Sequence, residues 1–369
     1  MSKTILLGLF ILLCHIPNTS AGQNTSANIK KPALSSKKLN LLIVPPSDPS
    51  TNRKEKNEWF GSLTEQYLHF RLGASNAFNR ISPDLIHEVH ASRKKKSPHI
   101  KTSFKDLAKK HKVTHILQPN YEIGKDGKNV YFYAELTSVL DPKNFSSFEA
   151  DFPLENYATS IDSCVFWIFT SMGLEYNTEI LSRFYNIKIL SSEIKDMKTI
   201  GQIILRQYLL PQQEINTSIN TLLTMIDNNP QNILAQYLAA KLLMFSSEYE
   251  KANKQLKNLL AILPNYASLY ADVSKNLRLS GNYNEALTYA ANAEKKGIIT
   301  NSLLLEGALS LESMQKYAKA EKAFNFILAK DSTETSALLF FVRQYNRTKN
   351  YKKAVLFADK VITIDPDNG

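Results

Sequence analysis

The carboxyl-terminal half of the chain carries apolar residues at helical spacing, and their pattern returns in the same phase every 34 residues. Tyr249, Tyr283, Tyr317 and Tyr351 lie 34 residues apart, and an alanine stands three residues after each of them. The alanine leaves room for two helices to approach closely, while the tyrosine can bury its ring and keep its hydroxyl at the wet edge. A fixed period of this length predicts a stack of similar helix-turn-helix units rather than a generic helical bundle.

Turn and stop signals keep the same phase. Gly281-Asn282 separates two helical segments, because glycine adopts the positive φ that a tight turn needs. Pro230, Pro264 and Pro366 follow the second segment of a unit, where proline ends one helix or begins the next. We therefore expect about five helical hairpins over residues 199–369, the first of them a divergent cap.

These columns resemble the tetratricopeptide (TPR) repeat. The resemblance implies an all-α solenoid that binds segments of other proteins along the concave face made by the first helix of each unit. The family's groove positions fall on Tyr237, Lys241, Phe245, Lys275, Arg278, Leu305, Leu309, Glu312, Arg343, Asn346 and Arg347. Basic residues stand beside apolar and aromatic ones in this set, so the hypothesis is an acidic or amphipathic partner segment. The alternative is that the cations are ordinary exposed helix residues.

The pattern changes over residues 38–175, where short apolar runs alternate with helical stripes. Apolar runs and period-two alternation predict strands at 39–44, 78–82, 113–123, 130–140 and 145–152. Helical spacing and helix-start signals predict helices at 59–70, 83–92, 104–111 and 157–173. This order predicts an α/β sandwich of sheet and helices. The whole chain is then α+β, with the sandwich, a connecting helical segment at 176–198, and the solenoid.

The sandwich resembles the TolB amino-terminal-like domain. The resemblance rests on Leu42-Ile43-Val44-Pro45-Pro46, on Trp59-Phe60-Gly61-Ser62-Leu63, and on the strand at 113–118 leading into a hairpin. Pro119 or Asn120 stands where the family usually has glycine, and residues 141–145 replace its glycine-tryptophan signature. The resemblance implies a bacterial envelope protein whose amino-terminal domain contacts other proteins and is not catalytic.

The amino terminus has the order of a secretory signal peptide. Lys3 supplies a positive charge, residues 5–13 are apolar, and small residues at 19–21 allow cleavage after Ala21. The apolar run is too short to span a bilayer as a helix, and no later run approaches the length of a membrane span, so the mature chain is expected to have no transmembrane span. We expect a signal peptide at 1–21, a polar linker at 22–37 and export to the periplasm of a Gram-negative bacterium. Lipid attachment at Cys14 is the alternative.

Charge is uneven along the chain, whose 45 basic and 34 acidic residues give a formal net charge of +11. Such an excess can attract a polyanion, an acidic protein or a membrane surface, while a solvated surface is the alternative. Few aromatic residues interleave the lysines, and export also argues against nucleic acid, so no nucleic-acid partner is expected. The excess gathers in a basic patch that includes Arg93, Lys94, Lys95, Lys96, Lys109 and Lys110.

Motifs for catalysis or metal binding do not stand out in the sequence. Cys164 is the single cysteine after signal cleavage, so no internal disulfide is expected, and its apolar stripe predicts a small buried hydrophobe. His87 and His90 lie three residues apart, but no histidine or cysteine cluster completes a metal site around them. We expect no catalytic residue, no metal and no cofactor.

The sequence therefore predicts a non-enzymatic exported scaffold that binds protein partners through the repeat groove. A solenoid offers a long surface to such a partner, which favours this interpretation. Two alternatives stay open. One is a sensor or regulatory module that binds a small ligand through the α/β domain, and the other is an envelope enzyme with a site between domains.

Overall fold

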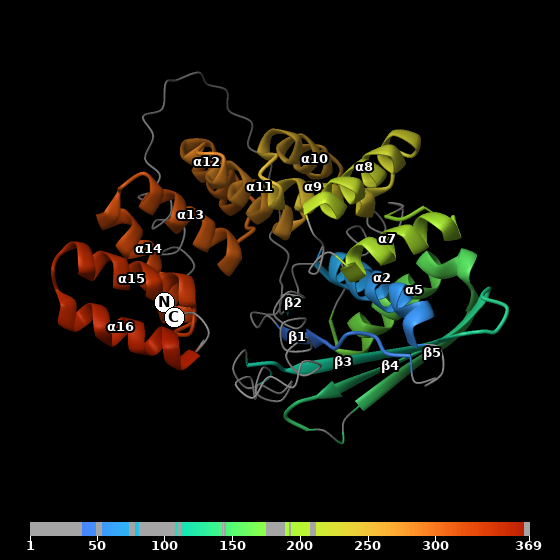
Figure 1. The fold of residues 1–369 in the computed structure, drawn as a ribbon. Helices are drawn as coiled ribbons and strands as arrows, with labels where there is room; N and C mark the ends of the chain where they lie inside the picture. Colours follow the sequence, from blue (N-terminus) through green and yellow to red (C-terminus); the bar gives the residue numbers. More distant parts are fainter. Residues whose placement is uncertain are drawn as a thin grey trace, which may run out of the picture. The chain divides into compact units, whose positions relative to one another are not determined.

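The computed structural model describes residues 39–48, 54–73, 78–80, 108, 112–141, 143, 145–174, 189–191, 193–206 and 212–364 (Figure 1). The chain divides after Ser246 into two compact units, an amino-terminal unit and a helical unit. The predicted signal peptide, linker and helix at 83–92 lie outside the described residues, as does most of the predicted connecting segment. The same holds for the basic-patch residues Arg93, Lys94, Lys95, Lys96, Lys109 and Lys110, and for His87 and His90.

The amino-terminal unit contains a five-stranded sheet with the order β2-β1-β3-β4-β5. Its strands are β1 (Leu39–Ile43), β2 (Phe78–Arg80), β3 (His115–Ile123), β4 (Asn129–Ser138) and β5 (Phe145–Pro153). Strand β1 is parallel to β2 and β3, whereas β3, β4 and β5 form an antiparallel meander. All five predicted strands are therefore confirmed. The predicted hairpin between β3 and β4 turns at Gly127, whose φ is +69°.

One face of the sheet is covered by α2 (Lys54–Gly73) and α5 (Tyr157–Ser171) (Figure 1). Along β4, Val130, Phe132, Ala134 and Leu136 are buried on that side, in the period-two alternation of a half-covered strand. Aromatic contacts join the layers: the rings of Phe60 on α2 and Tyr121 on β3 have centroids 4.8 Å apart. The sequence-predicted sandwich of sheet and helices is confirmed.

Helix α2 is buried along most of its length, including its polar residues. Thr64, Glu65, His69 and Arg71 are each almost inaccessible to solvent, as are the apolar side chains of the same helix. The reason is a second layer of helices, because α7 (Ile194–Arg206) packs along α2 within the same unit. Helices α8 (Gln212–Asn228) and α9 (Ile233–Phe245) follow and pack on each other.

The helical unit repeats one hairpin with an exact spacing. Its helices are α10 (Tyr249–Ile262), α11 (Ala267–Leu279), α12 (Tyr283–Lys295), α13 (Asn301–Ser313), α14 (Tyr317–Lys330), α15 (Thr335–Arg347) and α16 (Tyr351–Ile364). We call the first helix of each hairpin helix A and the second helix B. The A helices α9, α11, α13 and α15 begin 34 residues apart, and the B helices α10, α12, α14 and α16 begin at the four tyrosines. With α7 and α8 as the divergent first pair, the chain has the predicted tetratricopeptide-type hairpins.

The alanine that follows each tyrosine by three residues is buried in the repeat. Ala252, Ala286 and Ala320 are fully buried, and Ala354 is nearly so. Each of these positions has no room for a longer side chain, because native cores are packed to crystal-like density. Burial of the whole alanine column agrees with the expectation that a small residue at this position lets helix B pack tightly on helix A.

The turns between helices A and B all need a left-handed residue. Ser247, Gly281, Gln315 and Lys349 have φ values of +61°, +83°, +58° and +59°, and they again lie 34 residues apart. At Gly281 the turn is closed by two backbone hydrogen bonds, from Gly281 N to Arg278 O and from Asn282 N to Leu277 O. This is the Schellman arrangement that favours glycine. Only one of the four turns has glycine, so the other three carry conformational strain.

The first prediction concerns the contact between α2 and α7. A Cβ atom at Gly201 would lie 2.3 Å from the carbonyl oxygen of Trp59. Inside a helix, alanine is favoured over glycine by about 1 kcal/mol. Here the clash opposes that preference, because the Trp59 carbonyl oxygen belongs to the backbone and can move only if α2 moves with it. We expect Gly201→Ala to lower the free energy of unfolding of the amino-terminal unit by about 1–3 kcal/mol. Lys198→Ala, at an exposed position of the same helix, is the control and should stay near the parent.

The measurement is urea unfolding followed by tryptophan fluorescence. Both tryptophans of the chain, Trp59 and Trp167, lie in the amino-terminal unit, so the signal reports on that unit alone. A Gly201→Ala variant as stable as the parent would show that the two helices do not approach this closely.

The second prediction concerns the strained turns. We expect Gln315→Gly to raise the free energy of unfolding of the helical unit by up to about 1 kcal/mol. Relief of the left-handed strain outweighs the entropy that glycine adds to the unfolded chain. The reverse change, Gly281→Gln, should lower the same free energy by a similar amount. Far-UV circular dichroism during urea unfolding measures both, and shifts of equal sign in the two variants would contradict the assignment.

Candidate functional site

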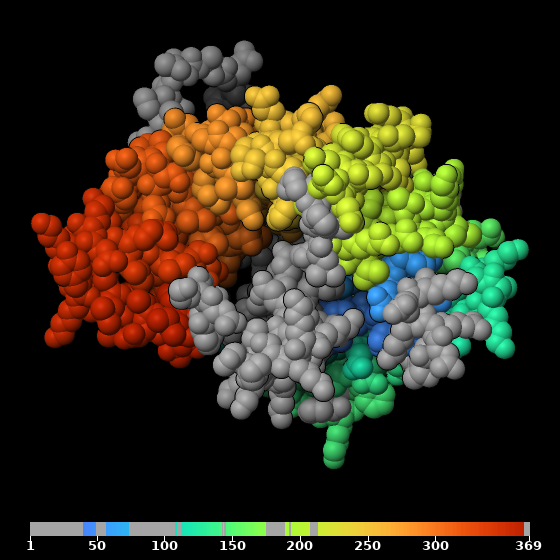
Figure 2. All heavy atoms as spheres, viewed as in Figure 1, coloured from blue at the N-terminus to red at the C-terminus, as the bar shows by residue number. Residues whose placement is uncertain are grey.

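The candidate site is the A-helix face of the helical unit. We define it by the groove positions on α11, α13 and α15: Lys275, Arg278, Leu305, Leu309, Glu312, Arg343, Asn346 and Arg347. The three helices come from consecutive repeats, and neighbouring elements pack in sequence order along the unit (Figures 1 and 2). Leu305 and Leu309 are half-buried against the core beneath, whereas Lys275, Arg343, Asn346 and Arg347 are exposed.

Two ion pairs tie neighbouring A helices together across this face. The Nε atom of Arg278 on α11 donates to Glu306 Oε2 on α13 at 2.7 Å, and both side chains are largely buried. On the other side of α13, Arg343 of α15 makes two parallel hydrogen bonds to Glu312, at 2.8 and 2.9 Å. Such a forked arginine–carboxylate pair fixes geometry as well as charge. The A-helix face is therefore cross-linked from α11 to α15.

These pairs change the interpretation of the groove cations. Arg278 and Arg343 are already neutralised by carboxylates of the chain itself, so they are not free to hold an acidic segment in the way the sequence suggests. Arg347 lies over the ring of Tyr317, with its guanidinium carbon 3.7 Å from the ring centroid. Lys275 is exposed and makes no ion pair or hydrogen bond within the described part of the chain. Of the four cations of the face, Lys275 is thus the one for which the described part of the chain supplies neither a carboxylate nor an aromatic ring.

The groove residues of the second repeat lie in the other unit. The ring of Tyr237 on α9 contacts Phe70 of α2, with centroids 5.5 Å apart. The Nζ atom of Lys241, on the same helix, lies 6.0 Å from the centroid of the Tyr237 ring. Phe245 is exposed. Part of this A helix therefore serves the packing of the amino-terminal unit.

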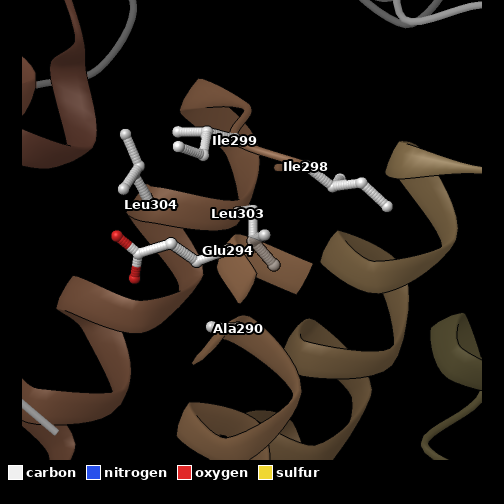
Figure 3. Close-up of a pocket in the computed structure, with 6 residues that line it drawn as sticks. All are labelled: Ala290, Glu294, Ile298, Ile299, Leu303 and Leu304. Atoms are coloured by element: carbon white, nitrogen blue, oxygen red, sulfur yellow. The ribbon is translucent and has the colours of Figure 1, made fainter. Parts of the chain in front are cut away.

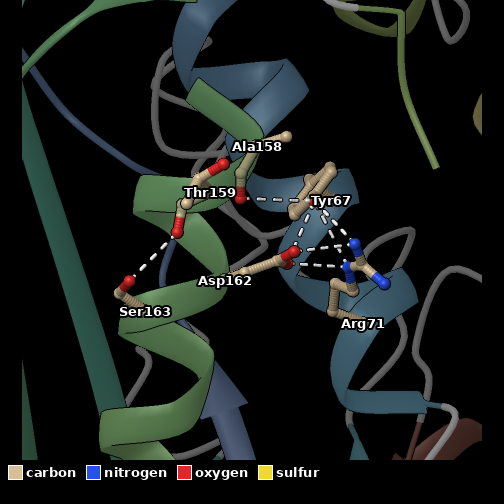
Figure 4. Close-up of polar contacts among 6 residues, drawn as sticks. All are labelled: Tyr67, Arg71, Ala158, Thr159, Asp162 and Ser163. Atoms are coloured by element: carbon tan, nitrogen blue, oxygen red, sulfur yellow. Dashed lines mark hydrogen bonds and ion pairs between the residues drawn. The ribbon is translucent and has the colours of Figure 1, made fainter. Parts of the chain in front are cut away.

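The amino-terminal unit contains a buried polar cluster that the sequence pattern does not predict. Figure 4 shows Arg71 of α2 against Asp162 of α5, with Arg71 Nη2 donating to Asp162 Oδ2 at 2.7 Å. Tyr67 donates to Asp162 Oδ1 at 3.0 Å and accepts from Arg71. Burial raises the pKa of Asp162 despite the neighbouring guanidinium. The cluster joins Arg71 and Asp162, which lie 91 residues apart in sequence on two helices, and neither helix alone predicts it.

Other chemistry-bearing residues have structural surroundings. Cys164 is free and fully buried in α5, and burial raises the pKa of its thiol, which confirms the predicted buried hydrophobe. Burial also lowers the pKa of His115, whose Nδ1 lies 3.1 Å from Thr114 Oγ1. Among the described residues, no three histidine, cysteine or acidic side chains gather as a metal site would require. In that same part of the chain, none of the helices combines the length and apolar character of a membrane span.

Comparison with known proteins gives fold-level likenesses only. No protein-family model matches the chain. No curated protein matches it. Solved structures similar to it include MamA, with 14% sequence identity over 44% of this chain and 94% of that chain, at a TM-score of 0.37. Another is YrrB, a TPR protein with an unusual peptide-binding site, with 18% identity over 46% of this chain and 87% of that chain, at a TM-score of 0.35. The repeat assignment rests on the spacing of the chain's own helices.

The third prediction separates the two ion pairs by their burial. The side chains of Arg278 and Glu306 are 18% and 10% exposed, whereas those of Arg343 and Glu312 are 52% and 19% exposed. Arg278→Ala leaves a largely buried carboxylate without its partner, so we expect the helical unit to lose about 1–3 kcal/mol of stability. Arg343→Ala should cost under about 1 kcal/mol, because water screens and solvates its partner.

Urea unfolding followed by far-UV circular dichroism measures both variants. Adding Glu306→Ala to Arg278→Ala should recover part of the loss, since the orphaned charge is then removed as well. Equal losses for the two arginine variants would show that burial does not set the strength of these pairs.

Proposed function

We propose that the protein is a non-enzymatic scaffold that holds a segment of a partner protein on the A-helix face of its helical unit. The observation that carries this proposal is the pair of ion-pair bridges that link α11 to α13 and α13 to α15. They hold the three A helices at fixed spacing before any partner arrives. A surface fixed in advance loses little conformational freedom on binding, which favours affinity.

The chemistry of the face favours an acidic or amphipathic partner segment. Half-buried Leu305 and Leu309 offer apolar contact on the central helix, between the cations of the flanking helices. The face and its bridges contain four cations and two carboxylates, which leaves two positive charges: Lys275, Arg278, Arg343 and Arg347 against Glu306 and Glu312. We assign the attraction chiefly to Lys275 and Arg347, because the other two arginines are paired within the chain.

The cellular setting is part of the same proposal. A signal-peptide pattern at residues 1–21 supports export to the periplasm of a Gram-negative bacterium. The order strand, helix, strand, meander and helix in the amino-terminal unit is what a TolB amino-terminal-like domain would present. Such a domain would join the repeats to an envelope complex and leave the groove to a second partner.

The fourth prediction tests the face with peptides. Selection of a random peptide library on the full chain should yield binders enriched in aspartate and glutamate beside apolar residues. Affinity for a selected peptide should fall as salt rises, because exposed charges are screened over about 8–10 Å at physiological ionic strength. Lys275→Glu should lower the affinity for that peptide about tenfold or more. The circular dichroism spectrum should stay unchanged, since the position is exposed.

Lys322→Glu is the matched control, because it makes the same charge change at an exposed position of helix B α14. If the affinity falls equally in both variants, the peptide is attracted by the overall charge of the protein and does not bind at a specific site. Binding that survives Lys275→Glu and Arg347→Glu together would place the partner elsewhere and refute the proposed face.

A further inference from the structure

The pocket between α12 and α13 is too small for an organic ligand (Figure 3). Its enclosed part has room for about one water-sized group. The residues that line it are Ala290, Glu294, Ile298, Ile299, Leu303 and Leu304. A larger ligand needs an open surface, and the free edge of the five-stranded sheet is such a surface.

Strand β5 is the last strand of the sheet, with β4 as its neighbour on one side. Among the described residues, no strand pairs with its other side. It is 9 residues long, whereas β2 at the opposite edge has 3. Proteins commonly protect a free edge with a short strand, a lysine or a proline. Since β5 contains neither lysine nor arginine, and its proline, Pro153, is its last residue, this edge is open to an added strand.

The hydrogen-bond pattern identifies the backbone groups at this edge. Leu154 N donates to Lys128 O, in register with the pairing of β5 and β4. In an antiparallel pair, every second residue bonds to the neighbouring strand, and the residues between them point their N–H and C=O groups away. The backbone groups of Ser147, Glu149 and Asp151 therefore face outward from the edge. All three residues are exposed, and no hydrogen bond from another described element covers these groups.

On the side of the helices, the edge is apolar. The ring of Phe148 on β5 has its centroid 5.8 Å from that of Trp167 on α5. Both side chains are half-buried, whereas the side chains of the neighbouring strand β4 on the same face are buried. The apolar layer is thus incomplete at β5, and an added strand would complete it.

The opposite face of the same edge is acidic. Glu149 and Asp151 are exposed there, and neither forms an ion pair in the described part of the chain. Tyr131 of β4 lies beside Glu149, and desolvation together with this carboxylate raises the pKa of the tyrosine. A second copy of β5 would bring its own carboxylates toward these, and like charges that face each other across two strands are unfavourable. A cationic strand would instead be attracted.

We propose that β5 accepts an added strand from a partner protein, an extended segment in which lysine or arginine alternates with apolar residues. Its cations would lie beside Glu149 and Asp151, and its apolar side chains would cover Phe148 and Trp167. A strand imposes this alternation, because successive side chains point to opposite faces. Backbone hydrogen bonds along the edge supply affinity, and the two faces supply selectivity. The edge shares no residue with the A-helix face, so this inference is independent of the proposed function.

The test uses a short fluorescent peptide of alternating lysine and valine, with capped ends, on the full chain. Fluorescence anisotropy measures its affinity, and a matched peptide of alternating glutamate and valine should bind about tenfold more weakly or worse. Two further peptides carry N-methyl groups, one on every lysine amide and the other on every valine amide. Only one of these two sets of amides can face β5, so one methylated peptide should lose affinity about tenfold or more and the other should keep it.

Two variants of the protein test whether the peptide binds at this edge. Ser147→Pro removes an outward N–H group and leaves the bonds to β4 in place, so it should lower the affinity about tenfold or more with an unchanged circular dichroism spectrum. Glu149→Lys should lower the affinity about fivefold or more, because repulsion replaces attraction.

Glu122→Lys is the matched control, because it makes the same charge change at an exposed position of β3 on the same face. This position is three strand spacings, about 14 Å, from the added strand, so screening should limit the loss of affinity to less than about twofold.

Three results would overturn the proposal. One is an equal response to the two methylated peptides, and another is an affinity that survives both Ser147→Pro and Glu149→Lys or falls equally in Glu149→Lys and Glu122→Lys. The third is a dimer of the free chain that Ser147→Pro dissociates, since the edge would then belong to a second copy.

Discussion

The burial of α2 is the constraint on which the amino-terminal unit depends. This helix lies between the sheet and α7, and its own sequence is not strongly amphipathic, because polar residues such as Glu65, His69 and Arg71 are buried along with apolar ones. Buried charges are tolerated only when they are paired, and the Arg71–Asp162 pair meets that condition while anchoring α5. Gly201 then allows α7 to pack against the backbone of α2, because a Cβ atom at this position would clash with the carbonyl oxygen of Trp59.

The early and the later repeats use their A helices for different contacts. The A helices α7 and α9 pack against α2, α7 at Gly201 and α9 at Tyr237. In the helical unit, α11, α13 and α15 are linked to one another by arginine–glutamate pairs instead. One repeat pattern thus serves two purposes: the early units hold the chain's own domain, and the later units present a surface.

Much of this fold could be predicted from the sequence because it rests on local and periodic signals. The alanine column, the tyrosine column and the period-two alternation of β4 each identify an element without knowledge of its neighbours. The first unit was expected to diverge, and its α7 begins at Ile194, five residues before the expected start of the repeats. The sequence gives no such signal for contacts between distant segments. Arg278 has the spacing of a groove residue, yet its partner Glu306 lies one repeat away and decides its role.

Glu294, at the end of α12, illustrates the same limit. Glu294 could have been noticed by aligning the five units on one another, since it stands in a column of isoleucine and leucine. That its side chain is buried, with Oε2 lacking a hydrogen bond in the described part of the chain, follows only from the fold around it. A repeat protein thus offers an internal reference, in which a departure from the common pattern marks a position worth explaining.

The single buried thiol has a practical consequence. Cys164 lies in α5 at the interface with the sheet, and residues 247–364 of the helical unit contain no cysteine. A thiol reagent can react with Cys164 only when α5 leaves the sheet, because the thiolate must form in contact with water. The rate of its modification therefore measures how often the amino-terminal unit opens.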